Sequence, residues 1–319
     1  MTQTSEILIS LLNWKNYSDT IQCIKQLYEF GYASKEIVVV DNASPNDSVE
    51  KIKNSFPEIE IIHSSMNNGF AAGHKMAVDY ALENNFELLW ILNPDVLLNE
   101  NTLPQLIDAY RRKGPAIYGS VSVSESNPEI VEFGGAYGII NGERSEVYDF
   151  HKGDNLSALQ HSSTEIQVGA IEGFSMLVPL EVIRKHRFMD TRFFLYGEET
   201  EYCLRLMDEG IPNYVVPGSV VVHKGEGSFG TSKKNNPVVA YYRARNYRLI
   251  AKKYFGLTNG KILKSVGGAR ALILFFIKWP FLCQTIKKEK QLDYFHNLGI
   301  LHALFNIKGK RVSPEKYSW

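Results

Sequence analysis

The sequence predicts an α/β fold with a mostly parallel central sheet flanked by helices, followed by a basic helical extension. Strand-like and helix-like segments alternate over the first hundred residues, which is typical of parallel sheets. The strand-like segments are continuous apolar runs, as expected for strands covered on both faces. From residue 237 onward the chain has 16 Lys and Arg against 3 Asp and Glu, although the whole chain has 35 of each. This asymmetry predicts two regions, 1–236 and 237–319, with different partners.

The individual elements follow from apolar spacing in chain order. Strands are predicted where short apolar runs occur, at 7–12, 36–40, 59–62, 87–92, 171–178, 215–216 and 220–222. Helices are predicted where apolar residues recur every three or four positions, at 17–30, 71–83, 199–209 and, beyond 237, to about 305. Residues 115–170 are rich in Gly, Ser and Asn, and we expect loops and connecting strands there.

Composition narrows the class of protein. The hydrophobic fraction of 44% is that of an ordinary globular chain. Cys23, Cys203 and Cys283 are far apart in apolar stretches, so we expect buried free thiols. Residues 1–6 are polar and lead directly into a strand, and no run reaches the roughly 18 apolar residues of a spanning helix. We therefore expect a cytoplasmic protein.

Two carboxylates follow predicted strands. Asp41, with Asn42 beside it, ends the second strand, and Asn93-Pro94-Asp95 follows the fourth. In open α/β sheets, ligands bind beyond the carboxyl ends of the strands. Asp41 could accept hydrogen bonds from a base or ribose, and Asp95 could hold one Mg²⁺ or Mn²⁺. Either segment could equally be a turn that caps the next helix.

Two later segments also carry reactive side chains. Glu198, Glu199 and Glu201 directly follow aromatic residues, which can desolvate a carboxylate and raise its pKa, as a general base requires. A solvated helix face is the simpler explanation of such a glutamate run. His223 ends a strand before a Gly-rich loop, so it could bind metal or phosphate, or be structural.

The order of these motifs along the chain resembles that of a known protein family. Asp41-Asn42-Ala43-Ser44, the segment 67–73 (Asn-Asn-Gly-Phe-Ala-Ala-Gly) and Asn93-Pro94-Asp95 are followed by segments 173–179, 193–205 and 220–228. Over roughly residues 5–250, the chain resembles family 2 inverting glycosyltransferases of the GT-A fold. The rhamnosyltransferase-like branch, which builds bacterial surface polysaccharides such as O-antigen, is the most similar.

The resemblance implies a role for each matching residue. Residues 1–236 would be the catalytic domain, with donor binding at about 1–100 and the acceptor and base region at about 168–236. The base would be Glu199, with Glu198 as the alternative, and the metal ligands would be Asp95 and His223. The donor site would be formed by Asn13, Trp14, Asp41, Asn42, Asn67, Gly69 and Asp95.

Three positions depart from the family pattern. Asn93 replaces the first carboxylate of the Asp-x-Asp motif, so the metal would have one fewer anionic ligand. Glu replaces Asp at the base position. His74 stands where Asn is usual after Ala-Ala-Gly.

The basic C-terminal region suggests contacts with phosphates or membranes. Arg243, Arg245 and Asn246 match a family segment and could bind acceptor phosphates. The apolar runs 271–277 and 279–282 are flanked by Lys and Arg, which is typical of a segment in a membrane interface. A helix packed on the catalytic domain or a homodimer interface would have the same pattern. No nucleic-acid motif accompanies the basic residues.

These observations predict an inverting, metal-assisted transfer. The sugar would move from dTDP-rhamnose or a UDP-hexose to a glycan acceptor. That acceptor would be linked to a polyprenyl diphosphate, and the enzyme would act at the inner face of the membrane. A nucleotidyltransferase is the second reading, although the Gly-rich phosphate loop typical of such enzymes does not follow the first strand. A degenerate carbohydrate-binding or scaffolding protein is the third.

Overall fold

The computed structural model of the chain describes residues 6–141, 144–149, 151–223, 236–265 and 288–317. The described residues fall into two compact units. The first is drawn from Met1–Gly138, Val147–Asp190 and Glu199–Ser228, and the second from Ile139–Glu146, Thr191–Glu198 and Phe229–Trp319.

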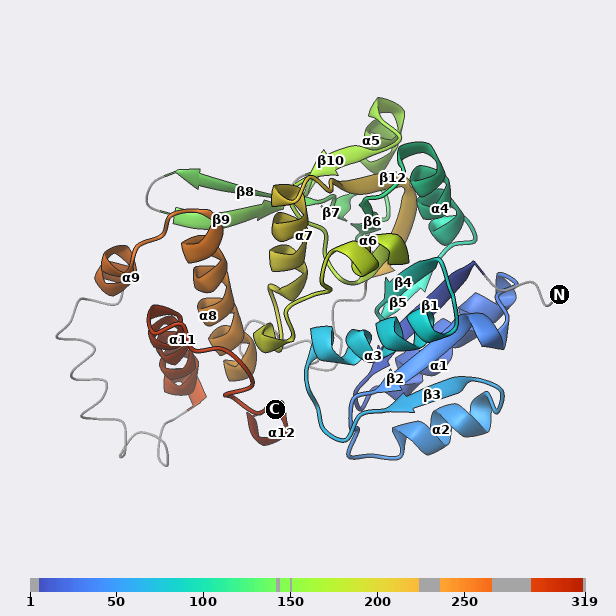
Figure 1. The fold of residues 1–319 in the computed structure, drawn as a ribbon, viewed down its shortest axis with the longest axis horizontal. Coiled ribbons are helices and arrows are strands. Elements are labelled where there is room, and N and C mark those ends of the chain that lie inside the picture. Colours follow the sequence, from blue (N-terminus) through green and yellow to red (C-terminus); the bar gives the residue numbers. More distant parts are fainter. Residues whose placement is uncertain (1–5, 142–143, 150, 224–235, 266–287, 318–319) are drawn as a thin grey trace. The chain divides into compact units, whose positions relative to one another are not determined.

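A large sheet forms the centre of the first unit, with ten strands among the described residues (Figure 1). Its parallel part contains β1 (Ile7–Asn13), β2 (Ile37–Asp41), β3 (Glu60–His63) and β4 (Leu88–Leu92). These strands pair in the order β4-β1-β2-β3. Because they are parallel, their carboxyl ends meet at one edge of the sheet, where ligands bind in folds of this kind.

The rest of the sheet is mixed. β11 (Ser175–Pro179) pairs antiparallel with both β4 and β6 (Ile117–Val123). β6 is parallel to β12 (Asn213–His223). The shorter strands β5 (Val96–Leu98), β7 (Val131–Phe133) and β10 (Ile166–Val168) add antiparallel pairs. A separate two-stranded sheet contains β8 (Ala136–Asn141) and β9 (Arg144–Asp149).

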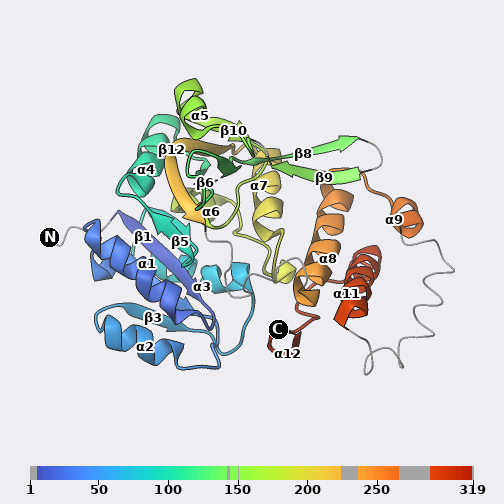
Figure 2. The ribbon, with the colours of Figure 1, turned by 180° about the vertical axis from the view of Figure 1, so that it is seen from behind.

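Helices cover both faces of the parallel part. α1 (Tyr17–Glu29) and α2 (Ser48–Ser55) lie on one face and α3 (Phe70–Glu83) on the other, as the two opposite views show (Figures 1 and 2). β1, β2 and β4 are almost entirely buried between them, which explains their continuous apolar sequences. α3 approaches β1 closely because Gly73 has no side chain: a Cβ there would lie 2.3 Å from Leu12 Cδ1.

Further helices complete the first unit. α4 (Thr102–Lys113) packs on β12 and β6, α5 (Leu156–Ser162) packs on β12, and α6 (Leu180–Lys185) packs on β11. α7 (Glu198–Asp208) begins at the glutamate segment and places Tyr202, Cys203 and Leu206 in the core.

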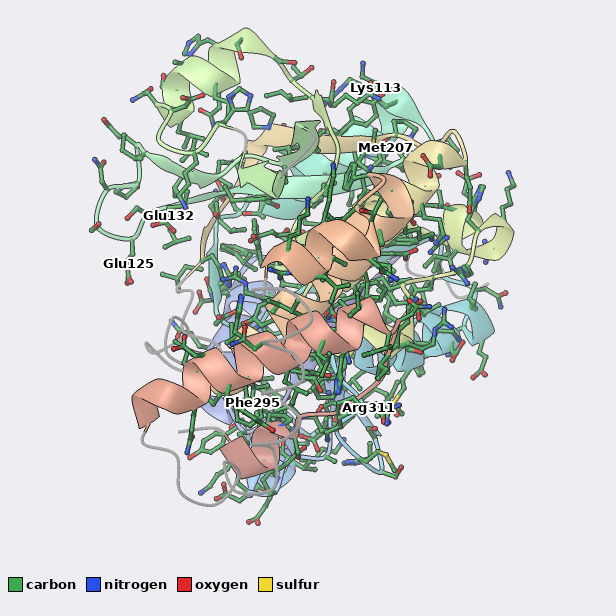
Figure 3. All side chains as sticks on the ribbon, turned by 90° about the vertical axis from the view of Figure 1, so that its left-hand side faces the viewer. Lys113, Glu125, Glu132, Met207, Phe295 and Arg311 are labelled. Atoms are coloured by element: carbon green, nitrogen blue, oxygen red, sulfur yellow. The ribbon has the colours of Figure 1, made fainter. Side chains whose placement is uncertain are left out.

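Residues 236–265 and 288–317 of the second unit are mainly helical. α8 (Pro237–Tyr254) and α11 (Lys288–Leu304) pack along each other, and α9 (Asn259–Ser265) and α12 (Pro314–Tyr317) accompany them. Their close contact depends on Gly299, since a Cβ there would lie 2.3 Å from the carbonyl oxygen of Tyr241. Phe295 on α11 joins an apolar cluster with Tyr241 and Tyr242 of α8, and Figure 3 shows it together with Arg311, which follows α11 in the chain.

The α/β fold with C-terminal helices is confirmed. For residues 115–170, where loops and connecting strands were expected, the prediction did not identify a strand of the central sheet. Residues 117–123 form a fully buried strand, β6, despite their Gly and Ser residues. Segments 215–216 and 220–222 belong to one strand, β12, with an irregularity between Val216 and Val220.

Other expectations are met in part or fall outside the described residues. Cys23 and Cys203 are buried and free, as predicted, whereas Cys283 is not described. Among the described helices, none combines the length and apolar character needed to cross a bilayer. The apolar runs 271–277 and 279–282 and the Gly-rich loop after His223 lie outside the described residues.

Candidate active site

A buried hydrogen-bond network joins the ends of β1 and β2. Asn13 and Asp41 are register partners, and Asn13 Nδ2 donates to Asp41 Oδ1 at 2.9 Å. Asp41 Oδ2 accepts from the backbone N–H of Ser44 at 3.0 Å, and Thr20 Oγ1 donates to Asn13 Oδ1 at 3.0 Å. The Asp41 carboxylate is therefore fixed at the strand end. Thr20 was not predicted, and Ser44 was predicted only as part of the motif 41–44, without a role, because a hydroxyl in a helix or turn gives no specific signal.

A second set of contacts links Asn42 to the turn before α3. Asn42 Nδ2 donates to Asn67 Oδ1 at 3.1 Å and to the Gly69 carbonyl at 3.2 Å, and Asn42 Oδ1 accepts from the Asn68 N–H. Gly69 has a φ of 87°, which favours glycine, and precedes the first residue of α3. The structure thus brings Asp41, Asn42, Asn67 and Gly69, all predicted donor-site residues, to neighbouring positions.

Trp14 also lies at the end of β1, beside the strand-end network. Its side chain is largely buried, and the ammonium of Lys15 lies 4.2 Å from the centre of its ring. Lys15 has a φ of 68°, and its N–H donates to Ser44 Oγ at 2.9 Å. The conformation after β1 is thus held by the same turn that holds Asp41.

Asp95 and His223 face each other across a strand pair. β5 and β12 are antiparallel with Val96 opposite His223, so Asp95, one residue earlier, lies beside the imidazole. His223 Nε2 is 3.4 Å from Asp95 Oδ1 and makes no hydrogen bond within the described part of the chain. The ring of Phe174 stacks on His223 at 5.1 Å between centroids. This register is a long-range property that strand patterns do not reveal.

The donor atoms of this pair suit a divalent cation. A carboxylate oxygen and an imidazole nitrogen 3.4 Å apart can both bind one ion, since ligand distances are about 2.1 Å. No group of three or more His, Cys, Asp or Glu ligands occurs among the described residues. The pair therefore fits an ion whose other ligands come from a substrate or water.

The three glutamates at the start of α7, Glu198, Glu199 and Glu201, lie in different environments. Glu201 is buried and lies 3.6 Å from Arg205 Nε, so it belongs to an internal ion pair. Glu198 is only 2% exposed, whereas Glu199 is partly exposed. Glu199 is close enough to contribute to the raised pKa of Cys203, about 12, of which burial is the main cause. Glu198 and Glu199 thus remain the two candidates for a base.

The three predicted acceptor residues differ in their accessibility. Arg243 is exposed, with its guanidinium 5.2 Å from the centre of the Tyr196 ring. Arg245 and Asn246 are fully buried and donate to backbone carbonyls. In this structure Arg243 alone of the three has a side chain that could meet an acceptor directly, and its role stays a prediction.

His74 is a buried histidine beneath the donor-site turn. Its Nδ1 lies 2.9 Å from Ser10 Oγ on β1, and its ring is 4.5 Å from that of Phe70. Burial lowers the pKa of His74 to about 3. The imidazole is therefore neutral at physiological pH, and its contacts are structural.

Replacing His74 with Asn should make the free energy of unfolding less dependent on pH. The unfolded chain protonates His74 near pH 6.5, but the folded chain does not until about pH 3, so this residue costs stability as the pH falls through that window. The slope is about 1.4 kcal/mol per pH unit for one proton. Urea unfolding between pH 4.5 and 7.5 should show a shallower slope for His74→Asn. An unchanged slope would mean that His74 is protonated in the folded state.

Comparisons with known proteins show similarity to glycosyltransferases. Residues 8–163 match the sequence model of the family described as "Glycosyl transferase family 2". The chain is 25% identical to the low-salt glycan biosynthesis hexosyltransferase Agl10 of Haloferax volcanii, over 99% of this chain and 95% of that protein. It is 24% identical to the dTDP-rhamnosyl transferase RfbF of Shigella flexneri, over 86% and 87% of the two chains.

One further relative and one solved structure are also similar to this chain. The N-acetylglucosaminyl-diphospho-decaprenol L-rhamnosyltransferase of Mycobacterium tuberculosis is 22% identical, over 74% of this chain and 81% of that protein. The mannosyltransferase PcManGT of Pyrobaculum calidifontis, solved with GDP-Man and Mn²⁺, superposes with a TM-score of 0.57 at 13% identity, over 96% and 88% of the two chains. The family match over residues 8–163 shows a glycosyltransferase family 2 domain in this chain, and the solved structure shows that the chain shares the GT-A fold.

Proposed function

We propose that this protein is an inverting, metal-assisted glycosyltransferase that moves rhamnose or a hexose from a nucleoside-diphosphate donor to a glycan acceptor. The observation that carries the proposal is the gathering of Asp41 and its partners at the ends of β1 and β2, in a chain that contains a family 2 domain and also pairs Asp95 with His223. The names of the relatives, which include rhamnosyl and hexosyl transferases, support the choice of sugar.

Donor binding is assigned to the strand-end network. Asp41, fixed by Asn13 and Ser44, would accept hydrogen bonds from the base or ribose, and Trp14 would line the nucleobase pocket. Asn42, Asn67 and Gly69 would contact the donor from the turn before α3. Because these side chains are already held by one another, little ordering entropy would be lost on binding.

Transfer requires a base at the acceptor hydroxyl. Glu199 would accept the hydroxyl proton while the acceptor oxygen forms its bond to the anomeric carbon from the face opposite the diphosphate. The bond from that carbon to the diphosphate oxygen breaks, and its electron pair leaves with the nucleoside diphosphate. This single displacement inverts the anomeric centre.

Asp95 and His223 are the residues that would hold Mg²⁺ or Mn²⁺. When bound, such an ion would offset the negative charge on the leaving diphosphate. Asn93 contributes no charge here, so the two residues would depend on the donor's phosphate oxygens to complete the site.

The acceptor is proposed to be a lipid-linked glycan of bacterial surface polysaccharide synthesis. A relative named for a diphospho-decaprenol substrate supports this choice. The basic residues after 237 would favour peripheral contact with the inner face of the cell membrane through anionic lipids. Exposed Arg243 would be available for an acceptor phosphate. We retain a homodimer as a further proposal.

A panel of nucleotide sugars tests the proposal directly. Thermal stabilisation and donor hydrolysis should be measured with dTDP-rhamnose, UDP-hexoses and GDP-mannose, each with and without Mn²⁺ or Mg²⁺. One donor should raise the melting temperature more than its free nucleoside diphosphate does, and should be turned over. A chain that binds sugars but no nucleotide would instead be a carbohydrate-binding protein, and one that releases pyrophosphate from a nucleoside triphosphate and a sugar phosphate would be a nucleotidyltransferase.

A further inference from the structure

The loop that leads into α7 has an unusual backbone. Phe194, Tyr196 and Gly197 have φ values of 71°, 63° and 87°, so three of four consecutive residues are left-handed. Such conformations are costly for Phe and Tyr and persist only where surrounding contacts impose them. The next two residues in the chain are Glu198 and Glu199, the candidates for the base.

Asn246 of α8 binds three carbonyls of this loop. Its Nδ2 lies 3.1, 2.9 and 2.6 Å from the carbonyl oxygens of Phe193, Leu195 and Tyr196, so its two N–H groups are shared among three acceptors. Gly197 packs directly on this side chain, because a Cβ at Gly197 would lie 3.4 Å from Asn246 Cβ. A single buried amide therefore fixes almost the whole left-handed segment.

Arg245 orients that amide and adds a contact of its own. Arg245 Nε donates to Asn246 Oδ1 at 2.8 Å, which turns the NH₂ group of Asn246 toward the loop. Arg245 Nη2 donates to the Phe193 carbonyl at 2.7 Å, and Nη1 donates to the Gly309 carbonyl at 2.6 Å. Its guanidinium also lies 4.8 Å from the centre of the Tyr242 ring.

We propose that Asn246 and Arg245 are positioning residues, which impose the left-handed loop 193–197 and thereby set the place of the base at the start of α7. Both side chains are completely buried, so they act on the loop and not on the acceptor. Apolar packing alone would not impose three left-handed residues, whereas hydrogen bonds to the carbonyls of residues 193, 195 and 196 do. This inference rests on the proposed function, because it assumes that Glu199 or Glu198 is the base.

Substitutions of Asn246 test the proposal with kinetics and amide hydrogen exchange. Asn246→Ala removes all three bonds to the loop, and Asn246→Ser keeps one short donor. The alanine variant should lose at least about 10-fold in kcat, because small displacements of a base are costly, while the donor KM changes less than about twofold. Exchange of the amides of residues 195–200 should become at least about 10-fold faster, and the serine variant should fall between alanine and wild type.

Tyr242→Phe is the matched control on the same helix. It removes a buried hydroxyl that donates to the Val312 carbonyl and accepts from the N–H groups of Arg311 and Val312, none of which belongs to the loop. A similar loss of melting temperature is expected, with kcat within about twofold of wild type and unchanged exchange at 195–200.

Three outcomes would contradict the inference, and they differ from failure of the proposed function. Unchanged amide hydrogen exchange at 195–200 in Asn246→Ala would show that Asn246 does not stabilise the loop. Faster exchange with normal kcat, or equal loss of kcat in Tyr242→Phe, would overturn the positioning role. If the wild-type chain transfers sugar from no nucleotide donor, the proposed function fails, and the assigned role of the loop fails with it.

Discussion

Glu199→Gln should lower kcat by a factor of at least about 10² and leave donor affinity nearly unchanged. Glutamine keeps the size of the side chain but accepts no proton, so only the step that needs a base is lost. Glu199 is partly exposed at the start of α7, whereas Glu198 is buried. Single-turnover transfer and donor titration would separate the two effects.

The neighbouring glutamates supply the controls for this experiment. Glu198→Gln tests the alternative base: if it loses turnover and Glu199→Gln does not, the roles are exchanged. Glu201→Gln should behave differently, because it breaks the buried contact with Arg205. That variant should lose melting temperature more than turnover, since the buried guanidinium of Arg205 loses the nearer of its two carboxylate neighbours. Full activity in both Glu198→Gln and Glu199→Gln would exclude both of these glutamates as the base.

Local patterns predicted the parallel half of the sheet well and the mixed half poorly. β1, β2 and β4 are apolar over their whole length because both faces are covered, and such runs are evident in any sequence. β6 was missed because Gly119 and Ser120 weaken its apolar pattern. They are required by packing: a Cβ at Gly119 would lie 2.2 Å from Ile171, and Ser120 Oγ bonds to Ser175 and Ser219.

The same distinction applies to the candidate site. Asp41 and Asp95 could be singled out because each follows an apolar strand, but their partners could not. The pairing of Asp95 with His223 depends on an antiparallel register between segments more than 120 residues apart. The buried contacts of Arg245 and Asn246 also depend on tertiary packing. In the sequence alone, the burial of these two polar residues is not evident, and their place near the catalytic core suggests an acceptor site.

Asp95→Ala should abolish stimulation by Mn²⁺ or Mg²⁺ and weaken donor binding about 10-fold or more. The variant loses the only carboxylate in the proposed metal site, and about 1.4 kcal/mol of binding free energy corresponds to each factor of ten. His223→Ala should have a smaller effect of the same kind, because an imidazole ligand carries no negative charge to attract the cation. Isothermal titration with the donor, with and without the metal, would measure both variants.

Asn93→Asp adds a carboxylate at the strand end where Asp95→Ala removes one. Asn93 separates β4 from Asp95 and is held by a backbone bond from its N–H to the Phe174 carbonyl at 2.9 Å, which an Asp can also make. A second carboxylate should therefore leave the fold intact and lower the metal concentration needed for half-maximal activity, by strengthening electrostatic attraction to the cation. Transfer that persists unchanged in excess chelator, with Asp95→Ala equal to wild type, would assign Asp95 and His223 a structural role. If Asp95→Ala loses donor affinity equally with and without chelator, Asp95 contacts the donor itself and not a metal.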